Sequence, residues 1–83
     1  MLTWKVETTA YVTVAQAIED AARRRATFVG VSADLEDGRL VIAVEEDGAP
    51  RSSRMVHLAD RVGALAGTLD VGITTLRAEI PCE

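Results

Sequence analysis

The spacing of apolar residues separates helical from strand-like segments along this chain. Between residues 10 and 25 apolar side chains recur every three or four positions, which predicts an amphipathic helix. The same spacing over residues 53–66 predicts a second helix. The apolar face expected for the first helix is formed by Tyr11, Val14, Ala15, Ile18 and Ala22. The face expected for the second is formed by Met55, Leu58, Ala59, Val62 and Leu65.

Segments rich in β-forming residues lie around these helices, and they predict strands. These segments are residues 28–34, 40–45, 68–71 and 74–80. Asp37-Gly38 is expected to form the turn of a hairpin, because glycine tolerates the positive φ of tight turns. Residues 1–7 alternate loosely and indicate an edge strand or an extended arm.

Residues that cap helices flank both predicted helices. Thr8 or Thr9 can accept a free backbone N–H at the start of the first, and Ser52 or Ser53 at the start of the second. Gly67 is typical of a helix end. The expected order is therefore β, α, β, β, α, β, β. This order predicts an α+β fold, a two-layer α/β sandwich whose helices pack on one face of a mixed or antiparallel sheet.

Composition narrows the class of protein. The chain has 83 residues, enough for one domain over residues 1–83, and a formal charge of −4 that argues against nucleic-acid binding. Arg23–Arg25 is the one basic cluster, interpreted as cations at a helix C-terminus or as an anion contact. The single Cys82 cannot form an internal disulfide. No signal-peptide pattern or long apolar run is present, so a cytoplasmic protein without membrane contact is expected.

Three stretches, taken in order, resemble a known family. They are Tyr11–Arg24, Asp37–Val44 and His57–Leu69, the last reading HLADRVGALAGTL. Together they resemble the ATP-binding domain of bacterial sensor histidine kinases, in the branch that partners LuxR-type response regulators. The resemblance implies the Bergerat-type sandwich shared with gyrases, Hsp90 and MutL proteins. It also implies a role in two-component signal transduction, with other histidine kinase domains or a response regulator as partners; open sheet edges leave a homodimer as a further alternative.

The resemblance implies ATP and Mg²⁺ as ligands, and it assigns positions to them. Asp20 stands where the family carries the asparagine that holds Mg²⁺, and Gln16 where it carries a glutamate one turn earlier. Glu46 matches the aspartate that accepts a hydrogen bond from the adenine amino group, with Asp47 matching in an alternative register. Gly48 retains one glycine of the turn that follows.

Several family positions are replaced in this chain. Pro50 stands where a second glycine is usual, and it fixes φ and removes an N–H. Residues 52–55 lack the glycines of the family's flexible lid, so a shortened lid is expected. Arg51 or Arg54 could meet phosphates in place of the lost backbone N–H groups. The glycine-rich segment before the last strand is reduced to residues 72–74, which leaves Thr74 as a binding candidate.

These replacements favour a histidine-kinase-like ATP-binding domain whose nucleotide binding is weak or lost. The alternative is a pseudokinase, a non-catalytic module for protein interaction or regulation. A third reading is a small α/β interaction domain whose resemblance to the family is accidental. No catalytic residue is assigned, because the family's phosphoacceptor histidine lies on a separate helix and His57 does not match it. Asp20 has a further interpretation, an ion pair with Arg23 or Arg24 one turn on.

Overall fold

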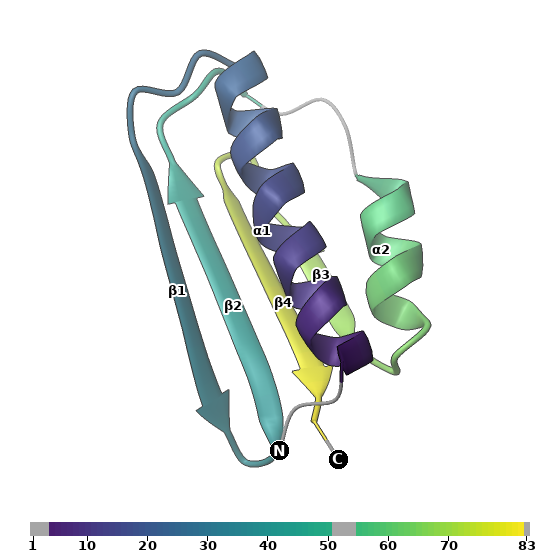
Figure 1. Cartoon of the computed structure of the whole chain (residues 1–83). Coiled ribbons are helices and arrows are strands. Elements are labelled where there is room, and N and C mark those ends of the chain that lie inside the picture. Colours follow the sequence, from purple (N-terminus) through teal and green to yellow (C-terminus); the bar gives the residue numbers. More distant parts are fainter. Residues whose placement is uncertain (1–3, 51–54, 83) are drawn as a thin grey trace.

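The computed structural model describes residues 4–50 and 55–82 and shows an α+β fold. Two helices lie side by side on one face of a four-stranded sheet (Figure 1). The helices are α1 (Trp4–Arg23) and α2 (Val56–Gly63). The strands are β1 (Val29–Glu36), β2 (Arg39–Glu46), β3 (Thr68–Val71) and β4 (Thr75–Pro81). The four strands predicted between residues 28 and 80 are therefore present, with ends that differ by at most two residues.

The sheet has the strand order β1-β2-β4-β3, and every neighbouring pair is antiparallel. Of the two sheet types expected from the sequence, the antiparallel one is observed. The predicted hairpin turn is confirmed: Asp37 and Gly38 have φ of 50° and 75° and join Glu36 of β1 directly to Arg39 of β2. Positive φ at both central residues is the requirement of the tightest hairpin turns.

The core lies between the helices and the two central strands. Alternate residues of β2 and β4 point toward the helices, and the largest of them, Ile42, Val44, Leu76 and Ile80, are almost completely buried. Leu58 and Val62 of α2 meet them from the helix layer. The predicted apolar face of α2 is thus confirmed at its centre, while Met55, Ala59 and Leu65 at its margins are half-buried.

The expected strand or arm at the N-terminus is wrong for residues 4–7, which form the first turn of α1. Val6 and Thr9 are buried against the core at helical spacing, so their side chains continue the stripe of the helix. Thr8 and Thr9 consequently lie inside α1 and do not cap it. The Ser52 and Ser53 caps expected for α2 lie outside the described residues.

The predicted apolar face of α1 is also wrong, except at Val14, which is half-buried against the core. The buried stripe consists of Val6, Thr9, Thr13, Ala17 and Ala21. Tyr11 and Ile18, the largest residues of the predicted face, are 75% and 45% exposed. Small side chains on the buried stripe let the helix approach the bulky aliphatic residues of the sheet closely, and the Thr13 hydroxyl is satisfied by donating to the Thr9 carbonyl at 2.7 Å.

After the end of α2, the backbone at Gly67 passes close to the backbone of β4. The Gly67 N–H donates to the Val62 carbonyl at 3.1 Å, and Ala66 takes the left-handed conformation with φ of 60°. A Cβ on Gly67 would lie 2.6 Å from the Glu79 carbonyl oxygen of β4. Gly67 therefore ends this turn as predicted, but through the lack of a side chain and not through a positive φ.

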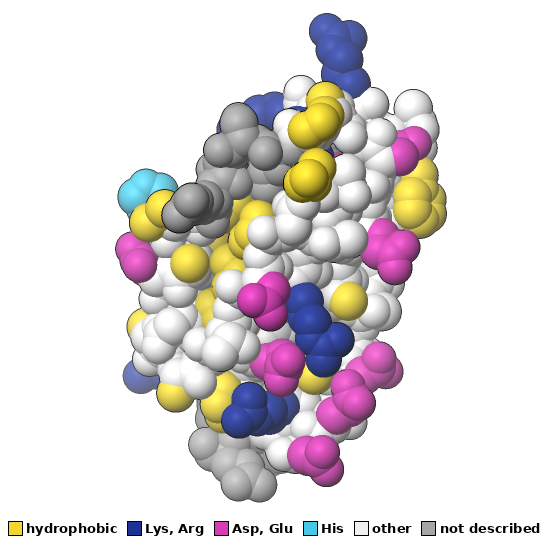
Figure 2. Space-filling model, turned by 180° about the vertical axis from the view of Figure 1, so that it is seen from behind, with side chains coloured by type: hydrophobic (Ala, Val, Ile, Leu, Met, Phe, Trp, Pro, Cys, Tyr) yellow, Lys and Arg dark blue, Asp and Glu magenta, His cyan; other side chains and the backbone are white. Residues whose placement is uncertain are grey.

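The face of the sheet that points away from the helices is polar. Figure 2 shows acidic and basic side chains spread over this side of the molecule. Alternation along the strands assigns these side chains to Asp34, Glu36, Arg39, Glu45, Asp70, Arg77 and Glu79. Glu79 is flanked by Arg39 at 3.7 Å and Arg77 at 3.2 Å. The sheet thus has one apolar face toward the helices and one charged face.

Candidate functional site

Arg24, directly after α1, is the centre of the largest polar cluster in the described residues. Its Nε donates to Oδ2 of Asp20 at 2.9 Å, one helical turn earlier. Its two terminal nitrogens donate to the two carboxylate oxygens of Glu46, with Nη1 3.1 Å from Oε1. Nη1 also donates to the Ala49 carbonyl at 2.7 Å. Arg24 therefore joins the end of α1 to the end of β2 and the loop that follows.

This cluster is largely removed from water. The side chain of Glu46 is 0% exposed, and those of Arg24 and Asp20 are 11% and 15% exposed. Burial alone would lower the pKa of Arg24, but the hydrogen bonds to Glu46 and Asp20 outweigh it and raise the pKa above its ordinary value. The guanidinium is thus held in its charged form between two carboxylates, in a paired geometry that favours planar recognition.

Asp47 fixes the connection between α1 and β1. Its Oδ1 accepts hydrogen bonds from the backbone N–H of Thr27 at 2.7 Å and of Phe28 at 2.9 Å. Its Oδ2 accepts from the Thr27 hydroxyl. The hydrogen bond from the Thr27 hydroxyl, with those from the backbone, lowers the pKa of Asp47 below its ordinary value. Both oxygens of this carboxylate are therefore used in holding the loop.

Gly48 and Thr74 complete this end of the molecule. A Cβ on Gly48 would lie 3.1 Å from the Arg24 carbonyl oxygen and 3.1 Å from Oε2 of Glu46, so the loop packs directly on the ion pair. The Thr74 carbonyl accepts a hydrogen bond from the Glu46 N–H at 3.1 Å. Three of the residues assigned to nucleotide binding, Asp20, Glu46 and Gly48, thus lie around Arg24, and a fourth, Thr74, bonds the backbone of Glu46.

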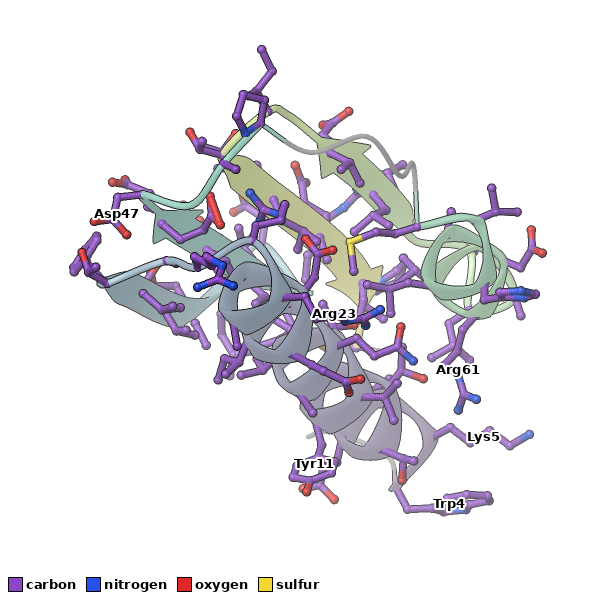
Figure 3. The ribbon with its side chains drawn as sticks, turned by 90° about the horizontal axis from the view of Figure 1, so that it is seen from above. Trp4, Lys5, Tyr11, Arg23, Asp47 and Arg61 are labelled. Atoms are coloured by element: carbon purple, nitrogen blue, oxygen red, sulfur yellow. The ribbon has the colours of Figure 1, made fainter. Side chains whose placement is uncertain are left out.

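A pocket of about 360 Å³ lies on the other side of Asp20, between α1 and the start of α2. It is lined by Gln16, Glu19, Asp20, Arg23, Met55, Val56, His57 and Leu58. Figure 3 shows Arg23 on the side of α1 that faces α2. Gln16 and Asp20, the two helix positions assigned to Mg²⁺ and nucleotide, therefore share a cavity. Glu46, Gly48 and Thr74 do not line it, and Arg54 lies outside the described residues.

The positions assigned to ATP and Mg²⁺ fit this ligand pair poorly as they stand. The buried Glu46 carboxylate cannot be reached from solvent by an adenine amino group. Asp20 could offer Mg²⁺ an oxygen only in competition with the hydrogen bond from Arg24. Glu19 adds a second negative charge to the pocket, and it pairs at 3.3 Å with Arg23, the arginine that a triphosphate would need there.

The sequence predicts one of the two ion pairs of Arg24 and gives no local pattern for the other. The pair of Asp20 with Arg24 follows from their spacing of four residues on a helix, and it is observed. The pair of Arg24 with Glu46 joins residues 22 positions apart, so no local sequence pattern predicts it. The sequence did contain one signal for this pair. Three acids, Glu45, Glu46 and Asp47, follow one another at the end of β2, and any of them that is buried needs a cation as partner.

No protein-family model matches this chain, and no curated protein matches its sequence significantly. The likeness to the histidine kinases therefore rests on the three resembling stretches alone. In the described residues, no helix combines the length and the apolar character needed to cross a membrane.

Proposed function

We propose that this chain is a degenerate ATP-binding domain of the sensor histidine kinase type, with a Bergerat-type sandwich and weak or lost nucleotide binding. Three features support this proposal. The resembling stretches lie on a helix, a hairpin and a second helix, in the order that the family requires. Both helices lie on one face of an antiparallel sheet. Gln16 and Asp20 line a pocket between the two helices.

The observation that carries the proposal is the bridging of Asp20 and Glu46 by Arg24. In the family pattern these positions contact Mg²⁺ and adenine, so the two side chains should face a ligand. Here an arginine from the same chain neutralises both. A nucleotide that used them would have to break a buried, hydrogen-bonded ion pair, which costs about 3–5 kcal/mol when one partner is withdrawn.

The expected affinity follows from this cost. A site that would otherwise bind with a micromolar Kd gains about 8 kcal/mol at the standard state, and a loss of about 4 kcal/mol makes the Kd millimolar. Binding in the pocket that avoided Asp20 and Glu46 would escape this cost but would lose the contacts that recognise adenine and the metal. Either route predicts a Kd of millimolar or weaker.

A titration tests the proposal. The isotope-labelled protein is titrated with a non-hydrolysable ATP analogue and Mg²⁺, and the amide signals of Gln16, Asp20, Glu46 and Gly48 are followed. Mg²⁺ alone and analogue alone are the reference titrations. We expect no saturable shift below about 1 mM ligand. Saturable shifts at these amides that depend on Mg²⁺ and have a micromolar midpoint would overturn the proposal.

Two charge variants locate any residual binding. Asp20→Asn removes a carboxylate beside the pocket, and Asp34→Asn removes one from the opposite face of the sheet, so both change the net charge equally. Weak binding in the pocket should strengthen in Asp20→Asn and stay unchanged in Asp34→Asn. An equal response of both variants would mean that the anion binds to the whole surface and not to this site.

A second candidate function is a non-catalytic module for protein interaction or regulation, with another kinase domain or a response regulator as partner. The observation that favours it is the exposure of large apolar side chains on α1 and β1, among them Tyr11, Ile18 and Leu35. The titration separates the two functions. If the amide signals of the pocket residues do not shift at several millimolar ligand, the interaction module is favoured. If they shift weakly at these concentrations, a residual nucleotide site is favoured.

A further inference from the structure

The long edge of the sheet is open. β1 is an edge strand of eight residues, while the opposite edge strand, β3, has four. Eight residues of strand extend over about 27 Å. An edge of this length presents a row of backbone N–H and C=O groups that can pair with another strand.

The backbone groups that face outward can be assigned from the hairpin. A two-residue turn makes Glu36 and Arg39 a hydrogen-bonded pair, and hydrogen-bonded pairs then recur at every second residue. The even-numbered residues of β1 therefore bond to β2. The odd-numbered residues, Val29, Val31, Ala33 and Leu35, direct their N–H and C=O groups away from the sheet.

These outward-bonding residues also carry the apolar side chains of the strand. Val31 and Leu35 are 44% and 65% exposed, although their side chains lie on the helix side of the sheet. Ile18 lies on the flank of α1 opposite the one that faces α2, and it is exposed too. Figure 3 shows Tyr11 pointing away from the sheet. In the described residues no element covers the helix side of β1 as α1 and α2 cover the central strands.

We propose that β1 pairs with β1 of a second copy of this chain, antiparallel and centred on Ser32, to form a homodimer with a continuous eight-stranded sheet. This register sets Val31 opposite Ala33 of the second copy and Val29 opposite its Leu35. All four outward-bonding residues then pair, which a register centred on Ala33 does not achieve. The two α1 helices stand on the same side of the joined sheet, so the apolar side chains of both β1 strands lie between them.

The charges of the strand agree with this register. Asp34 lies opposite Gly30 of the second copy, and the two Asp34 residues are about 14 Å apart, four residues along the strand direction. Glu36 lies opposite Phe28 of the second copy, so each acid of β1 faces a neutral residue. No like charges of the two β1 strands are therefore set directly opposite each other.

We infer a second copy of this chain as the partner of this edge, because β1 is complementary to itself in the antiparallel register centred on Ser32. When the strand runs against itself in this register, its apolar residues lie opposite apolar residues and its two acids lie opposite neutral ones. Proteins that remain monomeric usually protect a long edge with lysine, proline or a bulge, and residues 29–36 contain none of these.

Mass measurement with a backbone variant is the first test. Light scattering after gel filtration should give twice 8.9 kDa for the natural sequence at about 1 mM protein. Ala33→Pro removes one outward N–H while leaving the bonds to β2, and it should give 8.9 kDa with an unchanged circular dichroism spectrum. Ala33→Ser, which retains the N–H, should remain dimeric. A natural chain that stays monomeric, or an Ala33→Pro protein that stays dimeric, would overturn the proposal.

Disulfide trapping tests the register. In a Cys82→Ser background, Ser32→Cys places two thiols directly opposite each other across the twofold axis, close enough to bond. Asp34→Cys places them about 14 Å apart, beyond disulfide reach. We expect mild oxidation to convert Ser32→Cys to a covalent dimer at least ten times faster than Asp34→Cys. Equal rates, or faster trapping at position 34, would contradict this register.

Discussion

Arg24 donates to both carboxylate oxygens of Glu46, a residue 22 positions further along the chain, and thereby ties the end of α1 to the end of the central strand β2. The same guanidinium bonds Asp20 and the Ala49 carbonyl, so it connects three groups, of which the Glu46 carboxylate is fully buried. This one side chain therefore organises the end of the molecule where the sequence places a nucleotide site. It also accounts for the difference between the residues assigned to that site and their present environment.

Removal of Arg24 should destabilise the fold strongly. Arg24→Ala leaves the fully buried Glu46 carboxylate without its partner, which predicts a loss of about 3–5 kcal/mol in the free energy of unfolding. Arg23→Ala is the matched control: its pair with Glu19 is 70% exposed on both sides, and it should cost less than about 0.5 kcal/mol. Urea unfolding followed by circular dichroism measures both.

The double variant Arg24→Met with Glu46→Leu separates charge from packing. If the loss in Arg24→Ala comes from a buried unpaired carboxylate, replacing both partners by apolar residues should recover much of the stability. A double variant as unstable as Arg24→Ala would contradict this explanation. It would mean that the packing and hydrogen bonds of the guanidinium stem, and not the paired charges, hold this end of the fold.

Asp47 should make stability depend on acid pH. Its pKa is lowered in the folded state, first by the hydrogen bond from the Thr27 hydroxyl, so the unfolded state binds more protons where the two pKa values differ. The stabilisation is complete above the ordinary pKa of an aspartate, which applies in the unfolded state, and is lost as the pH falls through the lower folded-state pKa. The urea midpoint of Asp47→Asn should therefore fall less between pH 6 and pH 2 than that of the natural chain. The difference between the two falls should correspond to the titration of about one carboxyl group. Parallel pH profiles would contradict the prediction.

Two glycines close to α2 should respond in opposite directions to alanine. Gly67→Ala forces a Cβ to within 2.6 Å of the Glu79 carbonyl oxygen and 2.9 Å of Val62, so it should destabilise by about 1–3 kcal/mol. Gly63→Ala meets nothing within 4 Å and sits in the last turn of α2, so it should stabilise by about 0.5–1 kcal/mol. Thermal unfolding of the two variants checks the signs. Destabilisation by Gly63→Ala would contradict the helical assignment of that residue.

The fold was predictable from the sequence where local chemistry decides the structure. The Asp37-Gly38 turn follows from positive φ, and the strand that becomes β2 follows from its β-forming residues; both appear as expected. The N-terminal segment failed because its loose alternation suits an extended strand as well as a helix. Val6 joins the helical stripe only through its contact with the core, which is tertiary information.

The candidate site was predictable only in part, for the same reason. The resemblance brought Asp20, Glu46, Gly48 and Thr74 to one end of the fold, and the structure places them there. It gave no sign that Arg24 stands among them, because the family pattern specifies acids, amides and glycines at these positions. The partner of a buried carboxylate is set by three-dimensional proximity, and here 22 residues of chain separate the two.

The face of α1 that contacts the sheet offers the last prediction. Hydrophobicity favoured Ala15 and its neighbours as the buried face, whereas the structure buries Ala17 completely and leaves Ala15 exposed. Ala17→Leu should overpack the space between α1 and the sheet and cost about 1–3 kcal/mol. Ala15→Leu, with a side chain in solvent and nearly equal helix propensity, should change stability by less than about 0.5 kcal/mol. Urea unfolding of the two variants at a protein concentration below any self-association measures the difference. A larger loss in Ala15→Leu than in Ala17→Leu would mean that α1 is rotated about its axis and presents its large apolar residues to the core.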